Sequence, residues 1–571
     1  MRSETLLALF AVALMGCSDP GSKGSSDMAG VGSVDGAAIG PDMTPAADMV
    51  DTTPIPAPTI KHVGATGVTC CIVTDGNAHA AYLAAPSPLP NVSGTLHVTK
   101  SDGTDVQVAA PVPAGGFVLA PDGKSILFTK AANTSNALYW ADVTGATVTP
   151  KQIVATGFPT PQITPNNFFT PSGHFFVFGV LAPNVASSPD LHVVDVRTGT
   201  DVYQRLNGAF QYVQVVLPDD TMLLQDTAGG TGMGMPPVQT LYWVALPGTT
   251  PAAAITTRTA SFAPTADNKT LIILKTNGDL LTWDLTTKTG AGNKIASGVA
   301  TFSLGRTPTG PIAYLGADRS VHVLGTDGAK LLELPATAAA DLFGPVILTP
   351  DSGHAYFFQN VDTQDNRGTL LHVAVSSGAT ASKVADKVSL RDLSITDNAI
   401  VFLQNVDDLG QFGDAAKAAL DGSGVALLGM KANVGGLKVV NPGPDTWFAM
   451  HLTGAAIDTA NSTIDGSQNV LGGLGFADYT GASEIAVDPK VHAGTFAFSD
   501  NGRDAVFVTA AAFNATAGNY VGSLGFIATR APSTKIDGML SGVSEVGTIV
   551  SRSLFVNAPT ATPAGVYFIS Y

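Results

Sequence analysis

The chain has 571 residues and a net charge of −16, with 29 Lys and Arg against 45 Asp and Glu. Nucleic acids and anionic lipid surfaces select basic proteins, so this balance argues against both as the main partner. Only 13% of residues are charged, about half the usual share, while 45% are hydrophobic and Gly (62) and Pro (36) are frequent. This composition favours many short strands joined by tight turns around a substantial core.

The N-terminus has the pattern of an export signal. Arg2 precedes an apolar run over residues 6–15 that is too short to span a bilayer. The run ends in Leu-Met-Gly-Cys at Cys17, which resembles a bacterial lipobox. That resemblance implies cleavage before Cys17 and a lipid on its sulfur, with an ordinary secretory signal as the alternative. In lipoproteins an Asp directly after the Cys favours the inner membrane. Here Ser18 takes that place, so the outer membrane of the cell envelope is the expected location.

The sequence divides into three parts. Residues 1–16 are the expected lipoprotein signal peptide, and residues 17–57 are the lipidated Cys17 followed by a tether rich in Gly, Ser, Pro, Ala and Asp. The tether has too few apolar residues to repay ordering, so we expect it to be disordered. Residues 58–571 form the expected folded region, and no stretch within them predicts a second membrane anchor.

Two adjacent cysteines, Cys70 and Cys71, lie in an expected strand. Neighbouring side chains of a strand point to opposite faces, so we expect two small buried hydrophobic groups. In an oxidising compartment a vicinal disulfide is the alternative, although it needs a distorted backbone. Neither interpretation gives a Cys-x-x-Cys redox motif or a zinc site, and the redox state stays open.

A repeated unit runs through the expected folded region. A turn with Asp or Gly precedes an apolar, aromatic-rich strand, and a second strand of the form Leu-aromatic/His-Val follows. Most units are spaced by 42 to 50 residues, which is the length of a four-stranded propeller blade. The turns are centred at residues 75, 122, 172, 219, 267, 309, 351, 397, 443 and 500.

The Pro-Asp-Gly turn at residues 121–123, followed by an apolar strand ending at Phe128, resembles the TolB-like repeat of bacterial envelope proteins. This is a WD40-like repeat in the broad sense, although the Trp283-Asp284 pair is isolated. The resemblance implies a β-propeller and interaction with proteins. We therefore expect an all-β propeller of about ten or eleven four-stranded units. One large ring and two tandem propellers with a seam near 305–345 both fit. Residues 414–420 are expected to form two helical turns.

Candidate ligand residues are few. Four histidines recur at one position of the repeat, where packing in the core or between blades is the favoured interpretation over a metal ring. Asp362, Asp365 and Asn366 carry oxygen ligands suited to Ca²⁺, but their spacing does not fit an EF-hand, and solvated loops are the favoured interpretation. The four recurring histidines are His97, His192, His322 and His372.

No linear catalytic motif occurs, since both Gly-x-Ser-x-Gly and His-Glu-x-x-His are missing from the sequence. We assign no catalytic residue and no cofactor beyond the Ca²⁺ candidates. The sequence favours a lipid-anchored, non-catalytic binding or scaffolding protein with envelope proteins, peptides or glycans as partners. The alternative is a propeller enzyme, a metal-assisted hydrolase or lyase, with its site in the central funnel.

Overall fold

The computed structural model describes residues 58–570 with internal gaps. Throughout the described residues the regular secondary structure is β-strand, and no helix there is long and apolar enough to cross a membrane. The all-β prediction is therefore confirmed. The gaps are residues 68, 76–77, 88–91, 133–134, 159–167, 181–189, 206–209, 229–237, 249–252, 308–309, 337–341, 444–445, 458–469, 479–484, 493–494, 500–501, 503, 515–518, 529–534, 548 and 550–552.

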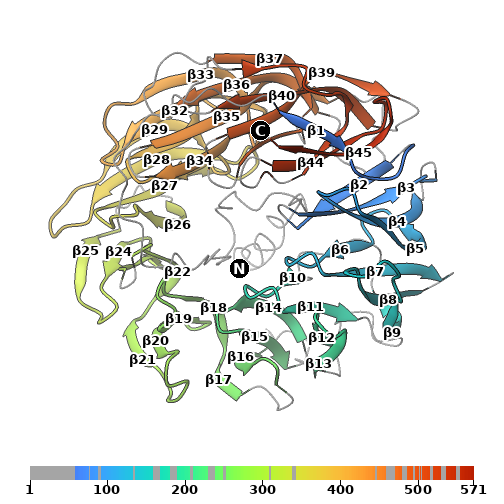
Figure 1. Cartoon of the computed structure of the whole chain (residues 1–571). Coiled ribbons are helices and arrows are strands. Elements are labelled where there is room, and N and C mark those ends of the chain that lie inside the picture. Colours follow the sequence, from blue (N-terminus) through green and yellow to red (C-terminus); the bar gives the residue numbers. More distant parts are fainter. Residues whose placement is uncertain are drawn as a thin grey trace.

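Seven four-stranded antiparallel sheets follow one another along the chain, and we name them units 1 to 7. They form successive blades of a ring whose later strands lie progressively farther from the centre (Figure 1). Units 1 to 4 comprise β2 (Thr69–Thr74), β3 (His79–Ala84), β4 (Ser93–Lys100) and β5 (Asp105–Pro113); β6 (Phe117–Leu119), β7 (Ser125–Ala132), β8 (Ser135–Asp142) and β9 (Lys151–Phe158); β10 (Phe168–Phe169), β11 (Phe175–Val180), β12 (Asp190–Asp195) and β13 (Thr200–Arg205); β14 (Phe210–Val216), β15 (Thr221–Ala228), β16 (Val238–Ala245) and β17 (Ala253–Thr257). Units 5 to 7 comprise β18 (Thr259–Pro264), β19 (Thr270–Lys275), β20 (Leu280–Asp284) and β21 (Asn293–Ala296); β22 (Val299–Leu304), β23 (Ile312–Gly316), β24 (Val321–Leu324) and β25 (Lys330–Leu334); β26 (Leu342–Leu348), β27 (His354–Asp362), β28 (Arg367–Ala374) and β29 (Ser382–Ser389).

The following units are less separate. Units 8 and 9 share one eight-stranded sheet, in which the ladder between β33 and β35 consists of a single residue pair, Ala432 with Thr453. Unit 10 has a fifth short strand, β42, paired with β40. These units comprise β30 (Leu393–Ile395), β31 (Ala399–Gln404), β32 (Phe412–Ala419) and β33 (Ala426–Asn433); β34 (Lys438–Gly443), β35 (Thr446–Ile457), β36 (Val470–Asp478) and β37 (Ile485–His492); β38 (Phe496–Phe498), β39 (Asp504–Asn514), β40 (Asn519–Ala528), β41 (Lys535–Ile536) and β42 (Ser541–Val543).

Unit 11 closes the ring with strands from both ends of the described chain. It contains β43 (Glu545–Val546), β44 (Ser553–Ala558), β45 (Gly565–Ser570) and, at its outer edge, β1 (Thr59–His62). Blue β1 lies beside red β45 in Figure 1, and the two strands are antiparallel, with Thr59 opposite Ser570 and His62 opposite Tyr567. The described residues thus form one ring of eleven units, which decides between the two predicted arrangements.

The region near 305–345, where the alternative of two tandem propellers places a seam, is built in the same way as its neighbours. Residues 299–334 form unit 6, and the adjoining β26 opens unit 7. Leu332 of unit 6 and Leu342 of unit 7 belong to one buried apolar cluster. The two units therefore pack directly against each other.

The repeated turns have a common place in the fold. Seven of the ten predicted turns, at residues 75, 122, 172, 219, 267, 351 and 397, lie between the first and second strands of a unit, and residue 443 is the last of β34. The predicted turns at residues 309 and 500 lie outside the described residues. In unit 2 the N–H of Gly123 donates to the Ala120 carbonyl across 2.8 Å, and the N–H of Lys124 donates to the Asp122 carboxylate across 3.0 Å. Gly123 has φ 65°, a region in which glycine meets no Cβ penalty. The Pro-Asp-Gly sequence therefore folds as its local chemistry dictates.

The strand after each turn is covered on both faces. Ile126 and Phe128 belong to a cluster with residues of unit 1, whereas Leu127 packs with Phe176 of unit 3. These three side chains of β7 are each at most 1% exposed. Alternate residues of the strand thus fill the two spaces between neighbouring blades, and this burial is the main stabilising contribution to the ring.

The expected helical turns at residues 414–420 are wrong, because this segment forms most of β32. Ala415, Ala416 and Ala418 are buried there, and Ala415 and Ala416 belong to different apolar clusters. Tertiary packing on both faces of the strand outweighs the helix propensity of alanine.

Candidate functional site

The predicted Ca²⁺ candidates lie at the hairpin between β27 and β28 of unit 7, with Asp362 as the last residue of β27 and Asp365 and Asn366 in the loop. The Asp362 carboxylate accepts the N–H groups of Gln364 and Asp365, at 3.0 and 3.3 Å. Asn366 has φ 50°, and its carbonyl accepts the N–H of Leu390 across 2.9 Å. The loop therefore uses its acidic and amide residues to form its own turn.

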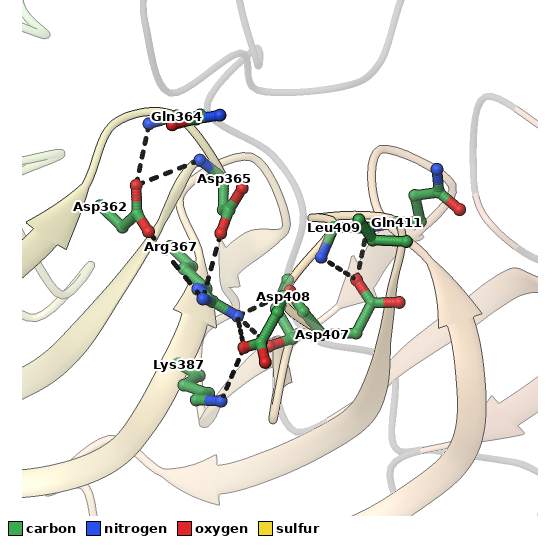
Figure 2. Close-up of polar contacts among 10 residues, drawn as sticks. Asp362, Gln364, Asp365, Arg367, Lys387, Asp407, Asp408, Leu409 and Gln411 are labelled. Atoms are coloured by element: carbon green, nitrogen blue, oxygen red, sulfur yellow. Dashed lines mark hydrogen bonds and ion pairs between the residues drawn. The ribbon is translucent and has the colours of Figure 1, made fainter.

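Arg367 lies at the centre of these carboxylates (Figure 2). Its guanidinium is 3.0 Å from the Asp365 carboxylate and 3.9 Å from that of Asp362. It also reaches unit 8, where it donates to the Asp407 carbonyl at 2.6 Å and to the Asp408 carboxylate at 2.9 Å. Arg367 supplies the positive charge that a metal ion would otherwise provide, and it joins the loops of two blades.

Lys387 adds a second cation to the same cluster, at 3.1 Å from the Asp408 carboxylate. Hydrogen bonds from Lys387 and Arg367 lower the pKa of Asp408, so this carboxylate stays ionised. Within the described part of the chain, no group of three or more His, Cys, Asp or Glu side chains is placed to hold a metal ion. The Ca²⁺ assignment of Asp362, Asp365 and Asn366 stays a prediction, and the ion would have to displace Arg367.

Two of the recurring histidines have the same surroundings in units 1 and 3. In unit 1 the His97 ring stacks on Tyr82 and lies 2.8 Å from the Asp105 carboxylate. In unit 3 His192 stacks on Phe178 and lies 2.6 Å from Asp201. In each case the aromatic ring, the histidine and the carboxylate come from the second, third and fourth strands of one sheet. The histidine position therefore joins strands within a blade.

The other two histidines keep the aromatic neighbour and change the polar one. His322 stacks on Tyr314 and contacts the Ser320 hydroxyl, whereas His372 contacts the His354 ring across 2.9 Å. Burial lowers the pKa of both His322 and His372. The four side chains lie in four separate sheets, each held by partners of its own unit.

A feature that the sequence did not predict lies on unit 8. Among the described residues seven large hydrophobic side chains are exposed, and four of them belong to this unit. We call these four the rim surface. They are Leu409 (74% exposed), Met430 (64%), Leu427 (54%) and Val425 (41%).

The rim surface follows the outer edge strand of unit 8. Val425 immediately precedes β33, Leu427 and Met430 lie on it, and Asn433 at its far end pairs with Phe412, close to the loop that carries Leu409. The sequence does not reveal this surface, because it does not show that β33 is the outermost strand of its unit and is partly open to solvent. The apolar run Val-Ala-Leu-Leu-Gly-Met at residues 425–430 predicts an ordinary buried strand.

The loop that presents Leu409 is held firmly against unit 7 (Figure 2). The Asp407 carboxylate accepts the N–H groups of Leu409 and Gln411, at 3.3 and 2.8 Å. Gly410 has φ 65°, and a Cβ at this position would come within 2.9 Å of the Asp365 carbonyl. The acidic cluster around Arg367 therefore fixes the position of an exposed leucine.

The adjacent cysteines differ from the favoured expectation. Cys70 is buried and Cys71 partly buried, but their side chains do not point apart: the two Sγ atoms lie 2.7 Å from each other. The pairing of β2 with β3 is irregular between Cys70 and Val73, and Cys71 has φ 63°. The expectation of opposite faces is wrong because a bulge interrupts the regular alternation.

Comparisons with known proteins assign no family to this chain. No protein-family model and no curated protein matches the chain. Among solved structures, a eukaryotic initiation factor is similar at 13% identity and a TM-score of 0.41, over 81% of this chain and 96% of that one. The tricorn protease is similar at 9% identity and a TM-score of 0.25, over 86% of this chain and 55% of that one. TolB from Acinetobacter baumannii is similar at 17% identity and a TM-score of 0.21, over 45% of this chain and 64% of that one.

Proposed function

We propose that this protein is a non-catalytic binding or scaffolding module of the cell envelope, anchored through a lipid on Cys17. The rim surface binds its protein or peptide partner. The observation that carries the proposal is the concentration of exposed apolar side chains on one unit of the ring. Apolar surface left in water forgoes about 25 cal/mol per Å², and grouped exposure of this kind marks an interaction site.

The edge of β33 suggests how the partner binds. In the described pairings its outer side meets another strand only where Ala432 pairs with Thr453. The backbone groups of residues 426–431 at this edge are suited to hydrogen bonding with an added strand. An extended partner segment with apolar side chains at alternate positions would pair with this edge and cover Leu427 and Met430.

The first test compares two outer strands of the same ring. The double variant Leu427→Ser, Met430→Ser removes the centre of the rim surface, and Leu331→Ser on the outer strand β25 is the matched control. Leu331 is exposed as well, at 38%. Surface changes of this kind alter the free energy of unfolding by about 0.5 kcal/mol or less, so any loss of binding has a local cause.

The measurement is crosslinking in envelope membranes, with the crosslinked peptides of this chain mapped by mass spectrometry. We expect the wild type and Leu331→Ser to capture the same partner through peptides covering residues 409–430. The double variant should lose this capture by about tenfold or more, since buried anchor side chains carry most of the energy at such contacts. Equal capture by the double variant, or crosslinks confined to other units, would overturn the proposal.

The anchor is tested separately. Cys17→Ser removes the sulfur that would carry the lipid, and we expect the variant to leave the membrane fraction while the wild type stays with the outer membrane. Mass spectrometry of the N-terminal peptide should show acyl chains on Cys17 in the wild type. An unmodified Cys17 in membrane-bound wild type would remove the anchoring part of the proposal and leave the binding part standing.

A further inference from the structure

We propose that Cys70 and Cys71 are a redox-sensitive lock on ring closure, which oxidation to a vicinal disulfide tightens. The two thiols lie at the contact between the first and the last unit. They belong to β2, the innermost strand of unit 1, and the backbone around them contacts β43 of unit 11. This inference does not depend on the rim surface or on the lipid.

The bulge at the cysteines forms a binding site for a carboxylate of the last unit. The N–H of Cys71 donates to Glu545 Oε1 across 3.1 Å, and the N–H of Ile72 donates to Glu545 Oε2 across 3.0 Å. Successive N–H groups point the same way because Cys71 adopts a left-handed conformation, with φ 63°. This arrangement is a backbone nest, which favours a negative charge.

The same bulge brings the two sulfurs together. Cys71 Sγ lies 2.7 Å from Cys70 Sγ, so the conformation that holds Glu545 also places the thiols for bond formation. A residue other than glycine is disfavoured at this φ. A covalent bond between the sulfurs would restrict Cys71 to this region and keep the nest formed.

The two cysteines are not equivalent in access. Cys70 is 2% exposed, whereas Cys71 is only partly buried. The proposed oxidant is a low-molecular-weight or protein disulfide.

In the first step the Cys71 thiolate attacks this disulfide, forms a mixed disulfide and expels one thiolate. The Cys70 thiolate then attacks the Cys71 sulfur, which forms the Cys70–Cys71 bond and expels the second thiolate. The two protons lost by the cysteines are taken up by the two expelled thiolates, so one disulfide is reduced for each one formed.

The test uses the full chain and glutathione disulfide. Native protein is equilibrated with reduced or oxidised glutathione, and the peptide carrying both cysteines is analysed by mass spectrometry separately from Cys17. We expect the oxidised wild type to lose two hydrogens from this peptide and to retain no glutathione. Cys70→Ser should instead trap one glutathione on Cys71, and Cys71→Ser should react at least tenfold more slowly, because Cys70 is buried.

The effect on closure is read by hydrogen exchange of β2 and β43 in the same samples. Oxidation should slow exchange of both strands by about fivefold, since the nest no longer opens through Cys71. The double variant Cys70→Ser, Cys71→Ser should not respond to glutathione disulfide. Two thiols that persist in native wild type at excess glutathione disulfide would overturn the disulfide, and an unchanged exchange rate in the oxidised protein would overturn the lock.

Discussion

Unit 2 and unit 11 occupy equivalent positions in one ring but are specified in different ways. Unit 2 is formed by four consecutive strands, and its Pro-Asp-Gly turn folds from local chemistry. Unit 11 takes three strands from residues 545–570 and its fourth from residues 59–62. Local sequence therefore builds an ordinary blade, whereas contacts between the chain ends must select the partner strands of the closing blade.

Buried polar groups join the last unit to the first. Asn557 of unit 11 donates to the Thr69 carbonyl of unit 1 across 3.0 Å, and the Thr69 hydroxyl donates back to the Asn557 side-chain carbonyl. Asn557 Nδ2 also lies 3.3 Å from the Ser544 hydroxyl and from the Glu545 carboxylate. Such hydrogen bonds are directional and costly to leave unmade, so they fix how unit 11 meets unit 1.

The largest predicted effect concerns a feature that units 2 and 11 share, a buried phenylalanine on the second strand. Phe128 in unit 2 and Phe555 in unit 11 are both 1% exposed and lie on the second strands of their units. Phe128→Ala and Phe555→Ala should each reduce the free energy of unfolding by about 3–5 kcal/mol, measured by urea denaturation. A much smaller loss for Phe555→Ala would show that the closing unit lacks the packing of an ordinary blade.

The next effect concerns what distinguishes the two units. Asn557→Ala removes several buried hydrogen bonds and leaves Thr69 and Ser544 without this partner, so we expect a loss of about 2–3 kcal/mol. The matched change in unit 2 is Thr129→Ala, which removes one buried side-chain hydrogen bond to the Gly116 carbonyl and should cost about 1 kcal/mol. Equal losses in urea denaturation would contradict a special role for polar groups at closure.

A third prediction concerns the buried Asp392, which lies between units 7 and 8 and binds the loop that connects units 8 and 9. Its carboxylate accepts the Ser389 hydroxyl at 2.7 Å and the Gly435 N–H at 2.8 Å. Burial raises the pKa of Asp392, so its contribution to stability is greatest at acid pH and declines as pH rises through the raised pKa. Asp392→Asn should therefore gain stability relative to the wild type with rising pH, at up to about 1.4 kcal/mol per pH unit. Denaturation curves across pH check this, and a difference independent of pH would refute it.

The smallest effect is expected at the repeat turns, where the contribution of an aspartate to stability falls with falling pH, the opposite of the pH dependence at Asp392. Hydrogen bonds from the Thr349 hydroxyl and the Gly353 N–H lower the pKa of Asp351. The stabilisation of the folded state by the Asp351 carboxylate is complete above the ordinary Asp pKa of about 3.9. It is lost as the pH falls through the lowered pKa of Asp351. Because the carboxylate is exposed, Asp351→Asn should remove only a few tenths of a kcal/mol. The wild type and variant should converge in thermal unfolding below about pH 3, and a constant difference would contradict this.

The sequence predicted the parts of the fold that depend on local chemistry. Asp122 and Gly123 reveal a turn because their own backbone preferences form it, and the strand Ile126 to Phe128 reveals burial on both faces. The pairing of Thr59 with Ser570 has no such local signal, because the partner lies at the other end of the chain. The number of rings could not be decided without it.

The candidate sites follow the same rule. The acidic residues at 362–366 can be found in the sequence. The place of Arg367 among them cannot, because it depends on contacts with a loop of the next unit as well as with Asp365. The contact between Cys70 and Cys71 depends on a bulge whose N–H groups meet Glu545, nearly the whole chain away. The exposure of Leu427 depends on its place in an outermost strand.

Closure of one ring through β1 and β45 is tested most directly by hydrogen exchange of the native full chain. We predict that the amides of residues 59–62 that face β45 exchange slowly, in step with those of residues 565–570, because the two strands open together. Exchange of residues 59–62 at the rate of an unfolded peptide, with residues 565–570 still protected, would contradict the closed ring.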